Sequence, residues 1–179
     1  MTAVATSVSE TSTVATVSST TTLSSTRGPL EFVDGKFLGI RQGSLLADAA
    51  AALGVTPVPI SGLDQSEPVY ACTGTPDPWV IRTGGLTLVF ESSAPEPKFL
   101  TNWRYIGGPV ASFTEMVAPN DMRIGDTRAK LEAAYPGFTD LVDEIDVSTP
   151  MSLRFGVEND TVNWFGIIDC VMEGQEPSG

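Results

Sequence analysis

Alternating apolar and polar residues mark two stretches of the chain as strands that each bury one face. In residues 86–91 every second side chain is leucine or phenylalanine, and residues 151–157 repeat the alternation with Met, Leu, Phe and Val. A period of two residues is that of a strand whose side chains point alternately to opposite faces. Each stretch precedes a short linker and another strand candidate, residues 99–106 and 161–170, so the pattern predicts two antiparallel hairpins.

Further strands are predicted in front of each hairpin. Before the first hairpin the candidates are residues 69–73 and 79–83, and Gly84-Gly85 follows them as a tight turn. Before the second hairpin only residues 138–147 can supply a strand. We therefore expect three or four strands in each half of the chain.

Two short alanine-rich segments, residues 45–53 and 127–135, are the predicted helices. Their alanines recur four residues apart and so lie on one helix face, where small side chains allow close packing on a sheet. Ser44 and Asp126 precede the two segments and are the expected N-caps.

These segments form three blocks that occur twice in the same order, which indicates an internal duplication. In the first block an Arg-x-Gly start, spaced alanines and a closing glycine occur in both halves: Arg41, Gly43, Ala47, Ala51, Ala52 and Gly54, then Arg123, Gly125, Ala129, Ala133, Ala134 and Gly137. The second block matches Leu86–Phe90 with Met151–Phe155, and the third matches Asn102-Trp103 with Asn163-Trp164.

The predicted fold is therefore α+β, with two tandem repeats after an N-terminal tail. Each repeat is a short helix packed on a three- or four-stranded antiparallel sheet, whose other face is left open. Repeat 1 spans residues 28–108, and the shorter, more acidic repeat 2 spans residues 109–176. Residues 1–27 are expected to be disordered, because sixteen of the first 26 are Ser or Thr and none is aromatic.

Two interpretations of this tail remain open. It is either a flexible extension or the spacer of an exported protein whose signal has been removed, with Met1 as a replacement start. The segment is not itself a signal peptide, since it lacks a basic start and a continuous apolar stretch. The second interpretation leaves open a lipid anchor upstream of residue 1.

The duplicated pattern resembles the secreted beta-lactamase inhibitory proteins of actinobacteria. The resemblance rests on a short helix that follows Gly43 or Gly125 and is closed by glycine. A meander that carries a tryptophan strand comes after each helix. The pattern is also similar to uncharacterised actinobacterial lipoproteins with the same repeat. The resemblance covers about residues 35–172 and implies two lobes that form one long curved sheet, whose concave face grips a protein partner. The family has a disulfide within each lobe, whereas this chain has one cysteine per repeat.

Composition and charge exclude several functions. With no histidine, the chain has no Ser-His-Asp triad, no Cys-His pair and no histidine metal ligand. The net charge of −12 argues against nucleic-acid binding, which needs Lys and Arg opposite the phosphates. No apolar run approaches the roughly 20 residues of a membrane-spanning helix. Neither Gly84-Gly85 nor Gly107-Gly108 fits a phosphate-binding loop, so no cofactor is expected.

Cys72 and Cys170, the only cysteines, have two interpretations. A disulfide would join the two repeats and would require an oxidising compartment, in agreement with export. Alternatively, both are buried free thiols. A catalytic cysteine is not expected, since no histidine is present to activate it.

The densest acidic cluster consists of Asp140, Asp143, Glu144 and Asp146. Oxygen-rich clusters bind calcium, but this spacing is not that of an EF-hand. Ordinary surface charge is the preferred interpretation. Calcium binding and a carboxylate pair for glycoside hydrolysis are the other interpretations that the residue types allow.

Aromatic and arginine side chains on the last strand of each repeat are the candidate partner-binding residues: Trp103, Arg104, Tyr105, Trp164 and Phe165. Trp, Tyr and Arg are the usual anchors of protein interfaces. Any of these aromatic side chains could instead belong to the core. Alternation alone does not tell which face of the sheet carries the helices.

The favoured function is a non-enzymatic, extracytoplasmic protein-binding module that recognises its partner through the open sheet face. Inhibition of an extracellular enzyme is its most specific form. The negative field would steer a basic patch of the partner. An envelope-assembly or structural lipoprotein and a small carboxylate-based hydrolase are the alternatives.

Overall fold

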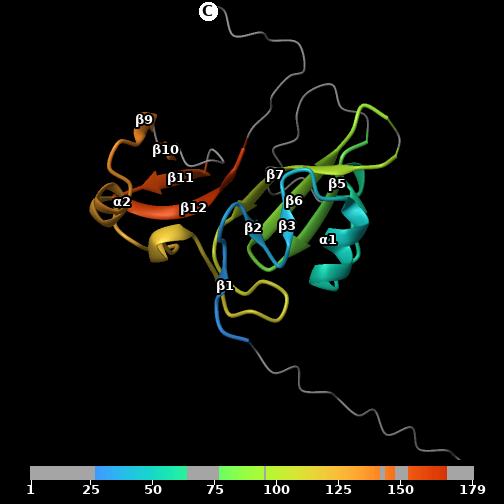
Figure 1. The fold of residues 1–179 in the computed structure, drawn as a ribbon, viewed down its shortest axis with the longest axis horizontal. Coiled ribbons are helices and arrows are strands. Elements are labelled where there is room, and N and C mark those ends of the chain that lie inside the picture. The colour runs from blue at the N-terminus through green and yellow to red at the C-terminus, as the bar shows by residue number, and fades with distance from the viewer. Residues whose placement is uncertain (1–26, 64–76, 95, 142–143, 148–152, 169–179) are drawn as a thin grey trace, which may run out of the picture.

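The computed structural model describes residues 27–63, 77–94, 96–141, 144–147 and 153–168. Their fold is α+β and is built on one eight-stranded antiparallel sheet of order β4-β5-β6-β7-β12-β11-β10-β9 (Figure 1). The first four strands of that order are β4 (Val58–Pro59), β5 (Trp79–Thr83), β6 (Leu86–Glu91) and β7 (Phe99–Tyr105). The other four are β12 (Thr161–Ile167), β11 (Leu153–Glu158), β10 (Glu144–Val147) and β9 (Thr139–Leu141).

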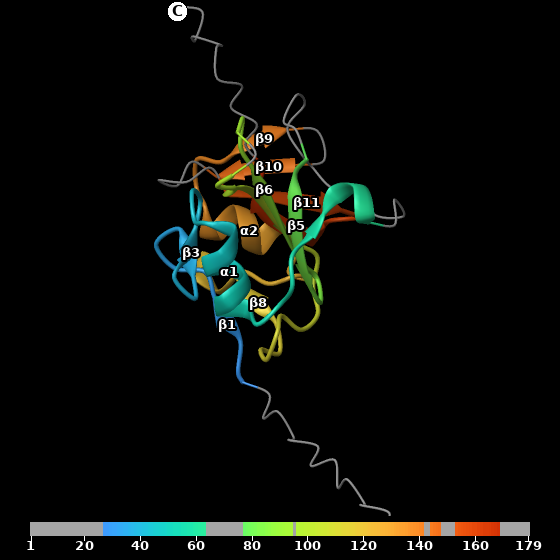
Figure 2. The ribbon, with the colours of Figure 1, turned by 90° about the vertical axis from the view of Figure 1, so that its right-hand side faces the viewer.

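The remaining elements are two helices, two 3-10 turns and two small strand pairs. The helices are α1 (Leu46–Leu53) and α2 (Arg128–Ala134), and the turns are η1 (Ile60–Gly62) and η2 (Pro119–Asp121). In the small pairs, β1 (Leu30–Glu31) runs parallel to β8 (Met116–Val117), and β2 (Lys36–Phe37) forms a hairpin with β3 (Ile40–Arg41). Figure 2 shows both helices and β1–β3 on the same side of the large sheet.

Most of the predicted elements are confirmed. Both helices lie within the predicted segments, and both hairpins, β6–β7 and β11–β12, are antiparallel. The segment 138–147 supplies two strands, β9 and β10, which pair with each other. The predicted disordered tail cannot be checked over residues 1–26, which lie outside the described residues. The strand candidate 69–73 also lies outside them. Arg27 belongs to the folded part, because its backbone pairs with Phe113.

The predicted N-caps act differently from the expectation. Neither Ser44 nor Asp126 is the N-cap residue; their side chains instead accept hydrogen bonds from the backbone N–H of Arg41 (3.0 Å) and Arg123 (2.8 Å). These bonds tighten the turn that leads into each helix. At the end of α1, Gly54 has the expected left-handed conformation, with φ 66°.

The start of each helix is tied to a distant strand by the same hydrogen bonds. Gly43 N–H donates to the Leu100 carbonyl, and Leu100 N–H donates to the Ser44 carbonyl, both at 2.8 Å. In the second half, Gly125 N–H donates to the Val162 carbonyl and Val162 N–H donates to the Asp126 carbonyl, again both at 2.8 Å. Each helix is thereby held at one end of the hairpin that follows it in the sequence.

A single hydrophobic core fills the space between the sheet and the helical layer. Aromatic rings run through it in contact, with Trp103 near the middle: its ring centroid is 4.9 Å from that of Phe32 and 6.1 Å from that of Phe165. The run continues from Phe165 through Phe155 to Tyr135, next to α2. This continuous core couples the halves of the sheet, so that they are expected to unfold together.

Tyr135, at the end of this run, gives a pH-dependent prediction. Burial raises its pKa to about 12, an effect that a hydrogen bond with Asn120 partly opposes, and its hydroxyl donates to the Pro119 carbonyl at 2.6 Å. A folded-state pKa above the ordinary value of about 10 means that the unfolded chain loses this proton first. The corresponding stability is complete below pH 10 and is lost as the pH rises through 12.

We therefore expect Tyr135→Phe to be about 1 kcal/mol less stable than wild type at pH 7, from the lost hydrogen bond. Between about pH 10 and pH 12 the wild type should lose about 2 kcal/mol more than the variant. Urea denaturation at stepped pH measures both. Parallel loss of stability in the two proteins over that range would contradict the prediction.

Candidate interaction surface

Three of the five predicted partner-binding residues lie in the core, which corrects the expectation that their side chains reach a partner. Trp103, Tyr105 and Phe165 are all at most 2% exposed. They point to the face of the sheet that the helices and β1–β3 cover. The hydroxyl of Tyr105 is used internally, since it donates to the Gly108 carbonyl at 2.6 Å. Their physical role is to fill the core rather than to recognise a partner.

Trp164 and Arg104 lie on the opposite face, because each neighbours a core residue along its strand and consecutive side chains alternate. The Trp164 ring is only 6% exposed and lies against Gly156: a Cβ atom on that glycine would be 1.8 Å from the indole Nε1. The Arg104 guanidinium lies 5.0 Å from the centroid of the Trp164 ring. The guanidinium of Arg104 is thus stacked on the Trp164 ring, and this cation–π interaction is suited to holding it in place.

Arg104 belongs to a row of arginines that crosses this face. In register, Arg82 of β5 pairs with Thr87 of β6, and Thr87 pairs with Arg104 of β7. Arg104 pairs with Gly166 of β12, and Gly166 pairs with Arg154 of β11. Successive arginines are therefore two strands apart, which is about 10 Å. We call Arg82, Arg104 and Arg154 the arginine row.

The position of the row stands out in an acidic protein. It holds three of the 10 basic residues of a chain whose net charge is −12. All three side chains are partly exposed. Planar guanidinium groups bind carboxylates through paired N–H donors and also stack on aromatic or peptide planes. Each of the three also has an interaction within the protein, so what the row offers to anionic or planar groups of a partner is its further N–H donors and its planar faces.

The sequence pattern pointed to Arg104 but not to Arg82 or Arg154. Alternation along each predicted strand puts its arginine on the polar face. The sequence pattern does not give the pairing register across the five strands. That register is what aligns the three arginines in one row.

Acidic side chains are the other candidates for chemistry. Among the described residues no group of three or more His, Cys, Asp or Glu side chains is placed to hold a metal ion. Several acids outside the sheet face have basic partners: Asp126 pairs with Lys130 at 2.7 Å, and Glu115 and Asp121 both pair with Arg123. In the predicted acidic cluster, Asp140 lies on β9 and Glu144 and Asp146 lie on β10. Asp143 lies outside the described residues.

Two further predictions concern a disulfide and a membrane-spanning helix. Cys72 and Cys170, the predicted disulfide, both lie outside the described residues. Within the described part of the chain, neither helix is long and apolar enough to cross a membrane.

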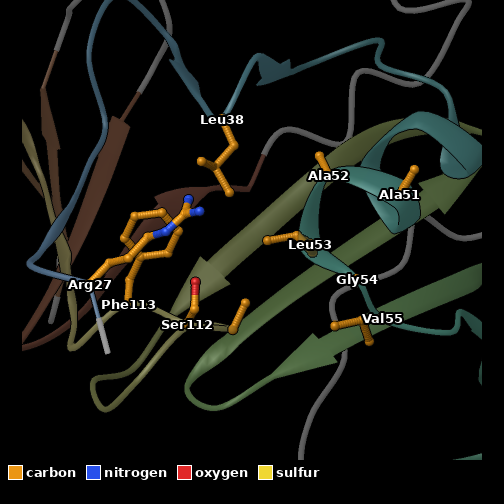
Figure 3. Close-up of a pocket in the computed structure, with 10 residues that line it drawn as sticks. Arg27, Leu38, Ala51, Ala52, Leu53, Gly54, Val55, Ser112 and Phe113 are labelled. Carbon is orange, nitrogen blue, oxygen red and sulfur yellow. The ribbon is translucent and has the colours of Figure 1, made fainter. Parts of the chain in front are cut away.

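A hollow on the other side of the molecule is the second candidate. It lies beside the C-terminal end of α1 and is bordered by Arg27, Leu38 and Phe113 (Figure 3). Since it shares no residue with the arginine row, the two can be tested separately.

Comparison of this chain with protein-family models, curated proteins and solved structures gives no match. Function is therefore inferred from the residues of the two candidate sites.

Proposed function

We propose that this protein is a non-enzymatic protein-binding module that recognises its partner through the sheet face opposite the helices. The observation that carries the proposal is the arginine row, which crosses this face at the centre of the sheet with Arg104 seated on Trp164. Paired strands hold their side chains in fixed positions, so little conformational entropy is lost on binding. Arginine is also among the residues that most often dominate interface energetics.

The charge distribution suggests what kind of surface the partner presents. Carboxylates opposite the arginine row would form charge-assisted hydrogen bonds. The acidic remainder of the chain would repel polyanions such as nucleic acid, and would favour a partner with basic residues around its carboxylates. This refines the expectation of a purely basic partner patch.

The proposal also includes the two tandem repeats. The matching hydrogen bonds at the starts of α1 and α2 support them, and so does the strand order, in which β4–β7 mirrors β9–β12. In this alignment Leu100 corresponds to Val162, and Arg104 and Gly166 pair at the centre. Export, with residues 1–26 as a spacer and Cys72 bonded to Cys170, belongs to the same proposal, as does the likeness to secreted beta-lactamase inhibitory proteins.

The test is a charge reversal in the row. We expect Arg104→Glu to weaken partner binding at least about 10-fold, because a carboxylate replaces the central guanidinium. Cross-linked partners from the culture medium and envelope of the source organism are identified first with the wild type, and the affinity for the recovered partner is then measured. Binding should also weaken as NaCl rises from about 0.05 M to about 0.5 M.

The matched control is Arg41→Glu, which makes the same charge change at an exposed arginine of β3, on the helical side. Equal losses in the two variants would show that net charge rather than the row controls binding. Binding that is unchanged in Arg104→Glu would contradict the proposal.

The identity of the partner separates the finer forms of the proposal. A soluble enzyme that loses activity on binding supports an inhibitor. A membrane-bound assembly factor supports an envelope-assembly lipoprotein. Turnover of a glycoside by the chain alone would support the hydrolase alternative and would contradict a purely binding role.

A further inference from the structure

A pocket of about 480 Å³ lies where α1 ends (Figure 3). One wall is the end of α1 and the residues that follow it, from Ala51 to Val55. The opposite wall consists of Arg27 and the segment Ala111–Phe113, and Leu38 reaches in from a third side. We call this hollow the α1 pocket. Its volume falls in the ordinary range of small-molecule sites.

Two tight turns border the α1 pocket, and both have apolar residues at unusual positions. Leu38 and Gly39 join β2 to β3, and both have positive φ, 49° and 78°. That conformation favours Asn-Gly. In the second turn, Val110 and Phe113 exchange both backbone hydrogen bonds around Ala111, whose φ is 50°. Glycine is the favoured residue there.

These two residues are exceptions within the described part of the chain. Eight non-glycine residues there have positive φ, and six of them are Asp or Asn, which tolerate that conformation. The other two are Leu38 and Ala111, and both line the α1 pocket. Strained backbone that is retained in this way is typical of functional sites. Leu38 is 38% exposed, so filling the core does not explain its presence.

The side of the pocket formed by Arg27 is suited to an anion. The backbone of Arg27 is fixed, because its N–H donates to the Ser112 carbonyl at 2.7 Å. Its guanidinium lies 5.6 Å from the centroid of the Phe113 ring, and the Ser112 hydroxyl points into the same space (Figure 3). A guanidinium and a hydroxyl together bind a carboxylate.

The other walls determine the orientation and chemistry of the ligand. Leu38, Leu53 and Phe113 offer apolar surface. The end of α1 carries the negative end of the helix dipole, which disfavours an anion on that side. The charged head is therefore directed toward Arg27, and the rest of the ligand meets apolar side chains.

We infer that the α1 pocket binds a small amphipathic carboxylate. Its head is held by Arg27 and the Ser112 hydroxyl, and its apolar body lies against Leu38, Leu53 and Phe113. This inference is independent of the proposed function, since it uses no residue of the arginine row.

The test is a titration of the full chain with octanoate, followed by amide chemical shifts in NMR spectra. We expect saturable shifts confined to the neighbourhood of Leu38, Gly54 and Ser112. Octan-1-ol, which has the same chain length without the charge, should bind at least about 10-fold more weakly, because Arg27 supplies a charge-assisted contact. Arg27→Gln should weaken octanoate binding by a similar factor, whereas the control Arg41→Gln should leave it unchanged.

Leu38→Asn separates a binding role from a structural one. Asparagine suits the positive φ of the turn, so this variant should unfold at no lower temperature than the wild type. It should nonetheless bind octanoate several-fold more weakly, because an apolar wall is lost. Weaker binding with retained thermal stability supports the inference.

Three outcomes would overturn it: shifts that do not saturate, equal binding of octanoate and octan-1-ol, or full affinity in Arg27→Gln. Arg104→Glu should bind octanoate like the wild type. Failure of partner binding in that variant therefore leaves this inference intact, and loss of octanoate binding in Arg27→Gln says nothing about the partner.

Discussion

Trp103→Ala is expected to destabilise the protein by about 3 to 5 kcal/mol, among the largest effects of any single truncation. The Trp103 ring is 2% exposed and contacts the rings of Phe32, Phe37 and Phe165. Its removal leaves a cavity in the middle of the aromatic run, where both halves of the sheet meet the helical layer. Total stabilities of domains are about 5 to 15 kcal/mol, so the variant should be close to unfolding.

Urea denaturation followed by circular dichroism measures this loss without relying on tryptophan fluorescence. The matched control is the next residue, since Arg104→Ala truncates a side chain on the opposite face and should cost about 1 kcal/mol or less. Similar urea midpoints for Trp103→Ala and wild type would contradict the placement of this ring in the core. A large loss of stability in Trp103→Ala and a small one in Arg104→Ala would show that the first side chain fills the core and the adjacent one does not.

Gly166→Ala is expected to destabilise by about 3 kcal/mol, although it adds only one methyl group. A Cβ atom at this position would lie 2.1 Å from the Trp103 carbonyl oxygen and 2.9 Å from the Arg104 Cα. Both are backbone atoms of the neighbouring strand, so no side-chain rotation relieves the clash. The strands β7 and β12 would have to move apart at the place where the two halves of the sheet join.

Gly28→Ala is the control for this substitution. A Cβ atom there would have no heavy atom within 4 Å, and Gly28 does not have a positive φ. We expect its thermal unfolding to match that of the wild type, while Gly166→Ala unfolds at a clearly lower temperature. If Gly166→Ala is as stable as Gly28→Ala, the close contact between β7 and β12 is wrong. Because Gly166 also pairs with Arg104, a surviving Gly166→Ala protein should show altered partner binding.

Local pattern was sufficient to predict most of the elements. Alternation at residues 86–91 and 151–157 located β6 and β11, since a strand with one buried face must alternate. Alanine spacing located both helices to within a residue or two, and Gly54 correctly ended the first. Acidic composition and the absence of histidine by themselves limited the chemistry open to the chain.

The two tryptophans of the repeated Asn-Trp pattern show where local pattern stops. Trp103 faces the core, whereas Trp164 faces away from it. The hydrogen bonds at the helix starts match Leu100 with Val162, which aligns Trp103 with Phe165. Both of these residues are buried on the helical side. A shared residue type therefore does not fix the face of a side chain, because a shift of one residue reverses the face of every side chain in a strand.

The sequence by itself therefore determined both helices, the longer strands, the acidic character and the residue types available for recognition. The two-residue strands β1–β4 and β8 are too short to show a period. Only the tertiary structure decided which sheet face the helices cover, and so which aromatic side chains are core. It also decided that Arg82, Arg104 and Arg154 share a row, and that Leu38 and Ala111 meet at one pocket. The physical reason is that face and register are set by pairing and packing between segments far apart in the chain, whereas periodicity reports only on neighbours.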